Sequence, residues 1–234
     1  MKLLEKFWTT IQPKPKTGTG KTTSERKTVG GLYRRRNQIT DTNMKRSILL
    51  SLVISVGALQ ALAFKQADLD KLLRTKICQK CDLQKAQLKG ANLERANLEY
   101  SDLKGANLEY VNLKYAKANH TNFEGTKLDG ANLKGISLLG ANLEAANLQN
   151  TNLQGANLNS ANLRYTNLRG TDLTYSMLKD AYLEDSNLKE TLLQGADFRG
   201  AYLEGALVNS EELGSAKLCD TVMPDGSETK KDCY

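Results

Sequence analysis

Residues 141–170 read ANLEA ANLQN TNLQG ANLNS ANLRY TNLRG. The same unit, a small residue, then Asn or Asp, then Leu, then two variable residues, runs in phase from Cys81 to Leu218. An apolar residue fills the third position of all 28 units, and leucine fills 24 of them. A strict tandem repeat predicts a solenoid whose units pack on their neighbours. We expect the leucines to form its core, including Leu83, Leu143, Leu148, Leu153, Leu158 and Leu163.

A five-residue period excludes the two common regular structures. On an α-helix, five residues advance about 500°, so the leucines would spiral around every side. On a straight strand, an odd spacing would send successive leucines to opposite faces. Every leucine can point inward only if the chain turns once per repeat. The repeat therefore predicts a coil whose sides are single pentapeptides, stacked at about the 4.8 Å spacing of β-strands.

The unit A-(N/D)-L-x-x, maintained over residues 81–218, resembles the repeat of the pentapeptide repeat family. This resemblance implies an all-β solenoid, a right-handed quadrilateral β-helix with four repeats per coil. The 28 repeats would then make about seven coils. The order of an apolar leader, a short helix, C-x-x-C, repeats and a Cys-bounded tail with MPDG is similar to that of exported cyanobacterial members.

Positive charge is concentrated before the repeats. Residues 1–46 contain 12 Lys and Arg against three acidic residues, whereas residues 64–234 contain 21 basic and 23 acidic residues. The formal net charge of +7 is therefore a local property of the leader. We expect the repeats to bind no nucleic acid, since such binding requires clustered positive charge on the folded domain.

An export signal is predicted at residues 44–63. Met44, Lys45 and Arg46 precede an apolar run that ends in Ala61-Leu62-Ala63, which is typical of a signal peptide cleaved before Phe64. Met44 is then a candidate true start, with residues 1–43 a basic, disordered leader or a gene-model extension. The alternative is an uncleaved anchor over 47–64, with membrane contact only through residues 44–64. The expected location is the periplasm or, following the cyanobacterial resemblance, the thylakoid lumen.

The four cysteines flank the repeats, and an oxidising compartment favours disulfides. Cys219 and Cys233 close a short loop through a Pro-Asp-Gly turn, so we expect them to be bridged. Cys78-x-x-Cys81 is compatible with a structural role, a disulfide or a redox function. A four-cysteine zinc site would require both pairs at one end, so no metal is expected.

Caps are expected at both ends of the solenoid, because terminal coils expose unpaired backbone. Residues 64–80 form the predicted N-terminal cap, with a short helix over 66–76 that places Leu69, Leu72 and Leu73 on one face. Residues 219–234 form the predicted C-terminal cap.

Enzyme chemistry is nearly absent from the sequence. His120, the only histidine, falls at an outward position, and we expect no catalytic residue and no cofactor. Large side chains gather late in the repeats instead. The candidate protein-binding patch comprises Tyr182, Tyr202, Met177, Tyr165 and Tyr175. The alternative is that the C-terminal segment folds back over Leu192, Leu207 and their neighbours.

These observations favour an exported, non-enzymatic structural or protein-interaction module whose partner is an unknown protein. One alternative is a thiol–disulfide role for Cys78-x-x-Cys81. Another follows from the family resemblance, because some members mimic DNA and bind type II topoisomerases. The near-neutral repeats, with 14 basic and 17 acidic residues, and the export signal disfavour that function.

Overall fold

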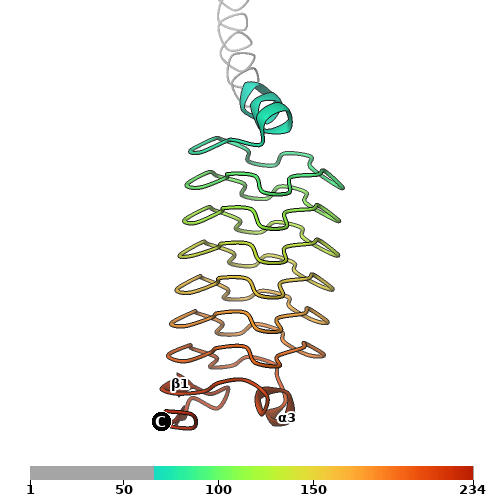
Figure 1. The fold of residues 1–234 in the computed structure, drawn as a ribbon. Coiled ribbons are helices and arrows are strands. Elements are labelled where there is room, and N and C mark those ends of the chain that lie inside the picture. Colours follow the sequence, from blue (N-terminus) through green and yellow to red (C-terminus); the bar gives the residue numbers. More distant parts are fainter. Residues whose placement is uncertain (1–65, 234) are drawn as a thin grey trace, which may run out of the picture. The chain divides into compact units, whose positions relative to one another are not determined.

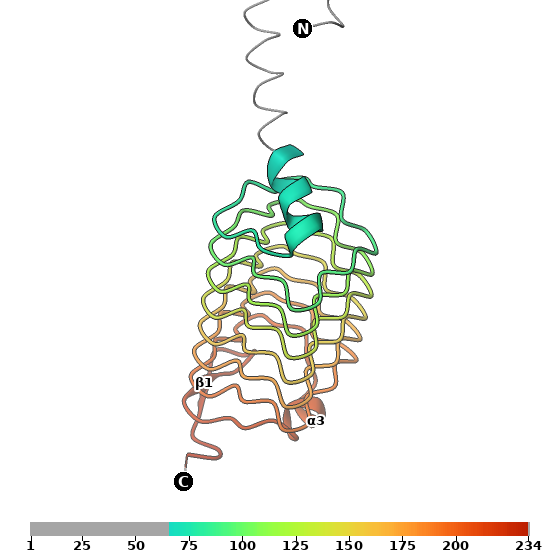
Figure 2. The ribbon, with the colours of Figure 1, turned by 45° about the horizontal axis from the view of Figure 1, so that its top comes forward.

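The structure, a computed structural model, describes residues 66–233. Parallel β-bridges join the second residue of each repeat to the residue twenty positions further on, from Ile77 with Asn97 to Tyr202 with Val222, except at Leu192, whose counterpart lies in the helix at 210–213. Twenty residues therefore make one turn of the chain. Since each turn contains four pentapeptides, the coil has four walls, and successive coils stack along one axis (Figure 1, Figure 2). We call this stack, residues 77–222, the rod.

A tight turn closes every pentapeptide and makes the corner between two walls. The backbone N–H of the small residue donates to the carbonyl of the preceding leucine, as from Ala86 to Leu83 at 3.0 Å. The residue just before the small one has a positive φ at every corner from Lys80 to Gly205. Turns of type II require this left-handed conformation at their third residue. Glycine fills 11 of these 26 corners, and the others carry side chains in a conformation that L-residues seldom adopt.

The leucines fill the interior of the rod. The six leucines named above as core positions are each at most 2% exposed. Threonines in the small position are also buried, and their hydroxyls donate to main-chain carbonyls, as from Thr121 to Leu98 at 2.7 Å and from Thr171 to Leu148 at 2.7 Å. The hydroxyls of these threonines therefore have hydrogen-bond partners inside the coil, so threonine can replace alanine at the small position of the repeat.

At the N-terminal end, a helix over residues 66–75 leads into the first coil. Its Leu72 is fully buried and Leu69 packs against the core, but Leu73 is 53% exposed, so the predicted three-leucine face is wrong at that position. Bridge pairing begins at Ile77, four residues before the predicted start of the repeats. The reason is that Cys78, fully buried, occupies a leucine slot.

The C-terminal end departs from the strict repeat. Helix α3, Ser210–Leu213, replaces one pentapeptide, although Leu213 stays buried. Asn209 caps this helix by accepting the Glu212 N–H at 2.6 Å, while the Glu212 carboxylate accepts the Asn209 N–H. Strand β1, Thr221–Val222, then continues the coil and pairs antiparallel with β2, Glu228–Thr229.

The C-terminal segment leaves two leucines uncovered. Leu192 is 59% exposed and Leu207 is 51% exposed, so the predicted fold-back over them is wrong. Instead, β1 pairs with the coil at Tyr202, and the hairpin extends that wall of the rod. The bridge to Tyr202 and the antiparallel pairing with β2 use backbone groups that a fold-back would leave unpaired.

Candidate interaction surface

Both ends of the rod are closed by carboxylates that replace a missing coil. Within the stack, the N–H of Asp102 donates to the carbonyl of Cys81 in the coil before it. Among the described residues no coil precedes Asp82, and its N–H donates to the Asp68 carboxylate of the first helix at 2.9 Å. At the other end, the N–H of Glu190 donates to Glu212 at 3.1 Å. The terminal coils therefore present fewer free backbone donors to a partner.

The cysteines lie at these ends as two disulfides, Cys78–Cys81 and Cys219–Cys233. Neither pair contains a free thiol, and no other cysteine occurs in residues 66–233. Cys78 is fully buried and Cys81 is 4% exposed, so the N-terminal disulfide lies inside the first coil. The two pairs close opposite ends of the rod, as their place in the sequence predicts.

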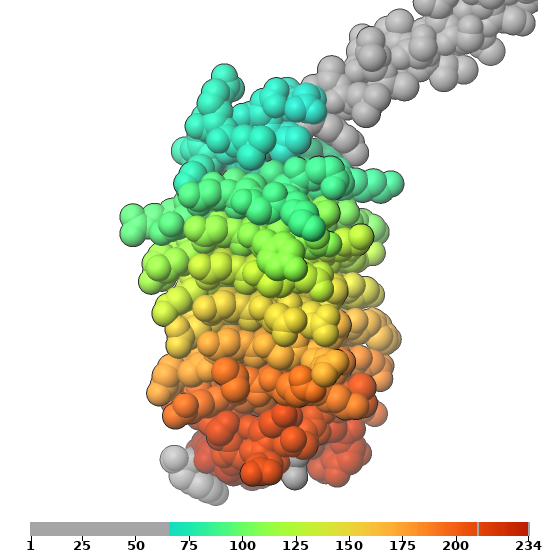
Figure 3. Space-filling view, turned by 90° about the vertical axis from the view of Figure 1, so that its right-hand side faces the viewer, coloured from blue at the N-terminus to red at the C-terminus, as the bar shows by residue number. Residues whose placement is uncertain are grey.

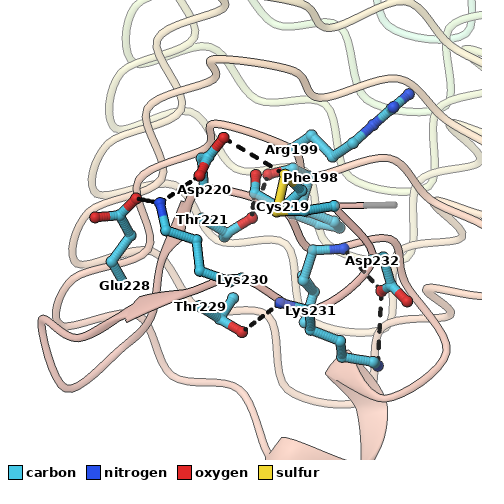
Figure 4. The surroundings of a disulfide bond; sticks show 12 residues. Phe198, Arg199, Cys219, Asp220, Thr221, Glu228, Thr229, Lys230, Lys231 and Asp232 are labelled. Atoms are coloured by element: carbon cyan, nitrogen blue, oxygen red, sulfur yellow. Dashed lines mark hydrogen bonds and ion pairs between the residues drawn. A yellow bond between two sulfur atoms is a disulfide. The ribbon is translucent and has the colours of Figure 1, made fainter.

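Charged groups surround the C-terminal disulfide (Figure 4). The Lys230 ammonium lies between the carboxylates of Asp220 and Glu228, and hydrogen bonds to both raise its pKa above the ordinary value. Asp232 accepts the N–H of Leu218 at 3.2 Å and so ties the tail to the last coil. These contacts fix the tail across the end of the rod, which is a structural role.

One wall of the rod differs from the others in charge. The acidic wall consists of residues 81–85 and the pentapeptides that follow at twenty-residue intervals to 201–205. It contains seven acidic and three basic residues, a net charge of −4. The three other walls, counted in the same way from 76–80, 86–90 and 91–95, have net charges of +2, +1 and +1 through residue 200. The negative charge of the rod is thus concentrated on one side.

Two tyrosines stack on the acidic wall. The rings of Tyr182 and Tyr202 lie 5.3 Å apart at an angle of 9°. The Arg164 guanidinium lies 4.4 Å from the centre of the Tyr182 ring and pairs with Glu184 at 2.7 Å. Tyr182 and Tyr202 are 36% and 41% exposed, and they occupy slots that usually carry asparagine. Their stacking, predicted from the twenty-residue spacing, gives this wall a rigid aromatic feature.

The predicted patch is divided among three walls. Tyr165 lies at a corner of the acidic wall and is 59% exposed, so it accompanies Tyr182 and Tyr202. Met177 belongs to the wall that contains residues 76–80, and Tyr175 belongs to the wall that contains residues 91–95. The Tyr175 ring covers Gly195, where an added Cβ would lie 2.6 Å from the ring. The sequence could not place these five residues on one surface, because neighbours in the chain lie on successive walls.

His120 is an outward corner residue, and its ring stacks on Tyr100 with centroids 5.2 Å apart. Within residues 66–233, the groups that combine cysteine and carboxylate are Asp68 with Cys78 and Cys81, and Asp220 with Cys219 and Cys233. Their sulfurs are bonded to each other, so these groups offer no thiolate to a metal.

On one side of the molecule, side chains of successive coils stack in layers from the first helix to α3 (Figure 3).

No helix in residues 66–233 has the length and apolar character to cross a membrane, and the predicted signal or anchor at 44–64 lies outside these residues. The basic leader over residues 1–43 lies outside them as well.

Comparison with solved structures finds pentapeptide repeat proteins. Rfr23 from the cyanobacterium Cyanothece 51142 is 30% identical over 54% of this chain and 97% of its own, with a TM-score of 0.38. HetL from Nostoc sp. strain PCC 7120, involved in heterocyst differentiation regulation, is 26% identical over 64% of this chain and 92% of its own, with a TM-score of 0.29. Comparison with curated protein sequences finds no match.

The repeats themselves identify the family. Its sequence profile, described as pentapeptide repeats, matches eight copies in the segments 77–114, 106–138, 136–174 and 177–208, which together span more than half of the 234 residues. The first matched residue coincides with the start of bridge pairing at Ile77. The chain belongs to the pentapeptide repeat family, and its fold is the right-handed quadrilateral β-helix of that family.

Proposed function

We propose that this protein is an exported, non-enzymatic module that binds another protein through a side wall of its rod. The observation that carries the proposal is the Tyr182–Tyr202 stack, which stands on a wall whose equivalent positions in three earlier coils are asparagines. Exposed aromatic side chains on an otherwise polar surface are typical of protein interfaces. The outward ring edges and hydroxyls offer both apolar area and hydrogen bonds.

The ends of the rod are poor candidates for the binding surface. The helix over 66–75 covers the first coil, while the hairpin, α3 and the Cys219–Cys233 disulfide cover the last. We infer a rod of about seven coils with the helix as its N-terminal cap. Such a rod offers long, regular walls, which are the surfaces that solenoid proteins commonly use for binding.

Export remains part of the proposal. The basic start and apolar run at 44–63 support it, as do the two disulfides, because disulfides persist in oxidising compartments. The periplasm or the thylakoid lumen fits these features. A redox role for Cys78-x-x-Cys81 is less favoured, since a reactive thiol must be reached by its substrate and both of these sulfurs belong to buried residues.

Site-specific photo-crosslinking in the producing organism tests the proposal. A photoreactive phenylalanine analogue replaces Asn162, which lies one coil before Tyr182 on the acidic wall. The control places the same analogue at Asn152, an equivalent slot on the opposite wall. We expect a discrete crosslinked protein from position 162 and none from position 152. A discrete product from position 152 only would move the interface to another wall, and no product from either position would contradict the proposed function.

A further inference from the structure

The acidic wall contains the same tyrosine–glutamate arrangement twice. Residues 181–184 read AYLE, and residues 201–204, one coil further, read AYLE again. In the first copy, Arg164 lies over the Tyr182 ring and pairs with Glu184. The residue equivalent to Arg164 for the second copy is Glu184 itself, which is acidic. The second copy therefore has the tyrosine ring and the carboxylate of the first copy, but it has no arginine at the equivalent position.

The carboxylates around the second copy are not neutralised. Glu204 and Asp185 are exposed, and neither pairs with a basic side chain among residues 66–233. Arg164 binds one oxygen of Glu184, and the other oxygen, Oε2, is buried without a hydrogen-bond partner. Of the three carboxylates at this end of the wall, only Glu184 thus has a basic partner among the described residues. Such an excess of acceptors favours additional cationic donors.

Three tyrosines lie among these carboxylates. We define the tyrosine–carboxylate patch as Tyr165, Tyr182, Tyr202, Glu184, Asp185 and Glu204. Exposed ring carbons and hydroxyls accept the methylene stems of lysine and arginine while their charged groups meet carboxylates. An acidic, aromatic surface of this kind repels phosphates, which disfavours nucleic acid as the ligand.

We propose that the tyrosine–carboxylate patch binds an extended, arginine- or lysine-containing segment of a partner protein. This inference rests on the proposed function and names the chemistry of the partner. A guanidinium from the partner pairs with Glu204 and Asp185 as Arg164 pairs with Glu184, and its stem packs against Tyr202. The choice of partner follows from charge complementarity, because the three other walls have no net negative charge to offer.

Peptide binding to the disulfide-containing protein, as the cell makes it, tests this inference. The probe is a fluorescent ten-residue peptide of alternating glycine and arginine, and a glycine–glutamine peptide is its neutral counterpart. The patch variant is Glu184→Gln, Asp185→Asn, Glu204→Gln. The control variant, Glu109→Gln, Asp129→Asn, Glu190→Gln, removes the same number of charges from a flanking wall. Thermal melting of both variants verifies that they are folded.

We expect the control variant to bind the arginine peptide within about twofold of the unmodified protein. The patch variant should bind about tenfold more weakly, because it removes the two carboxylates that pair with the partner's guanidinium and a third negative charge beside them. Arg164→Gln removes the internal competitor and should tighten binding by about threefold. Any one of three results would overturn the inference. These are that the two triple variants lose affinity equally, that the neutral peptide binds as tightly as the arginine peptide, or that Arg164→Gln binds the arginine peptide no more tightly than the unmodified protein does. The crosslinking at Asn162 is read independently, so a partner without basic character would leave the proposed function in place.

Discussion

The ends and the walls of the rod differ in which groups hydrogen-bond to their backbone. At each end, non-repeating residues supply what the next coil would have supplied: Asp68 and Glu212 accept backbone N–H groups, and each end holds a disulfide. Along the walls, backbone groups pair between coils, and outward Asn and Asp side chains accept the N–H two residues further on, as Asn142 does from Glu144. Stability therefore depends on backbone partners at the ends and along the walls, whereas binding is left to the other outward side chains of the walls.

The largest expected effect concerns the interior. Ala118 fills a leucine slot and Ile136 fills a small slot beside it one coil later, so we expect Ile136 to occupy the space that Ala118 leaves. Ile136→Ala should lower the free energy of unfolding by about 2–5 kcal/mol, and Ile136→Val by about 0.5–1.5 kcal/mol. Chemical denaturation measures both. A loss below about 0.5 kcal/mol for the alanine variant would refute this pairing.

The two disulfides should stabilise the ends unequally. Cys219 and Cys233 are 14 residues apart, whereas Cys78 and Cys81 are three apart. The longer loop loses more entropy on closure, so replacing Cys219 and Cys233 with alanine should cost about 3 kcal/mol. The same change at Cys78 and Cys81 should cost about 2 kcal/mol from loop closure. Denaturation of both double variants checks the order, and an equal or inverted order would contradict the entropic account.

Removal of a capping carboxylate should have a smaller effect. Asp68→Ala leaves the N–H of Asp82 without its acceptor in the first helix, which should cost about 1–2 kcal/mol. Asp70→Ala in the same helix is the matched control, because Asp70 is exposed and its partner is Gln66. Its expected cost is within about 0.5 kcal/mol. Similar losses in the two variants would show that Asp68 acts through the helix rather than through the coil end.

The smallest expected effect depends on pH. The Asp197 carboxylate is nearly buried, and hydrogen bonds from Arg199 at 2.8 and 2.7 Å hold its pKa below the usual range, with Lys179 also nearby. Because the folded pKa lies below the unfolded value of about 3.9, the ionised carboxylate stabilises the fold above that pH. This contribution disappears as the pH falls through the folded pKa.

Asp197→Asn should therefore be less stable than the unmodified protein at about pH 6, by about 1 kcal/mol or less. The difference should shrink as the pH is lowered below about 3.9. Thermal melting across this range measures it. A difference that stays constant or grows on acidification would show that the carboxylate charge does not contribute.

The repeat predicted the wall architecture because one pattern recurs with each pentapeptide. The leucines from Leu143 to Leu163 lie in the core, and the stacking of Tyr182 on Tyr202 follows from their spacing of one coil. The ends could not be predicted in the same way. Glu212 occupies an asparagine slot in the strict pattern, yet Asn209 and Glu212 cap a helix there. Local capping outweighed the repeat, and the N-x-x-E signal was available in the sequence.

The candidate surface was only partly predictable. The outward positions of Tyr182 and Tyr202 follow from the repeat, but the placement of Tyr175 and Met177 on two other walls requires the twenty-residue coil. The contact of Arg164 with Tyr182 depends on side-chain direction between coils, which composition does not reveal. The charge of the acidic wall becomes visible only when residues are sorted by wall rather than by order in the chain.

Export of the rod and closure of its ends by disulfides are the two properties on which its role as a binding module depends. The most direct test is the intact mass of the protein recovered from the membrane-enclosed compartment of the producing organism, with and without reduction. We predict a chain that begins at Phe64 and is lighter by four hydrogens than its reduced form, because both cysteine pairs are bonded. A full-length chain with four free thiols would contradict export and closed ends together.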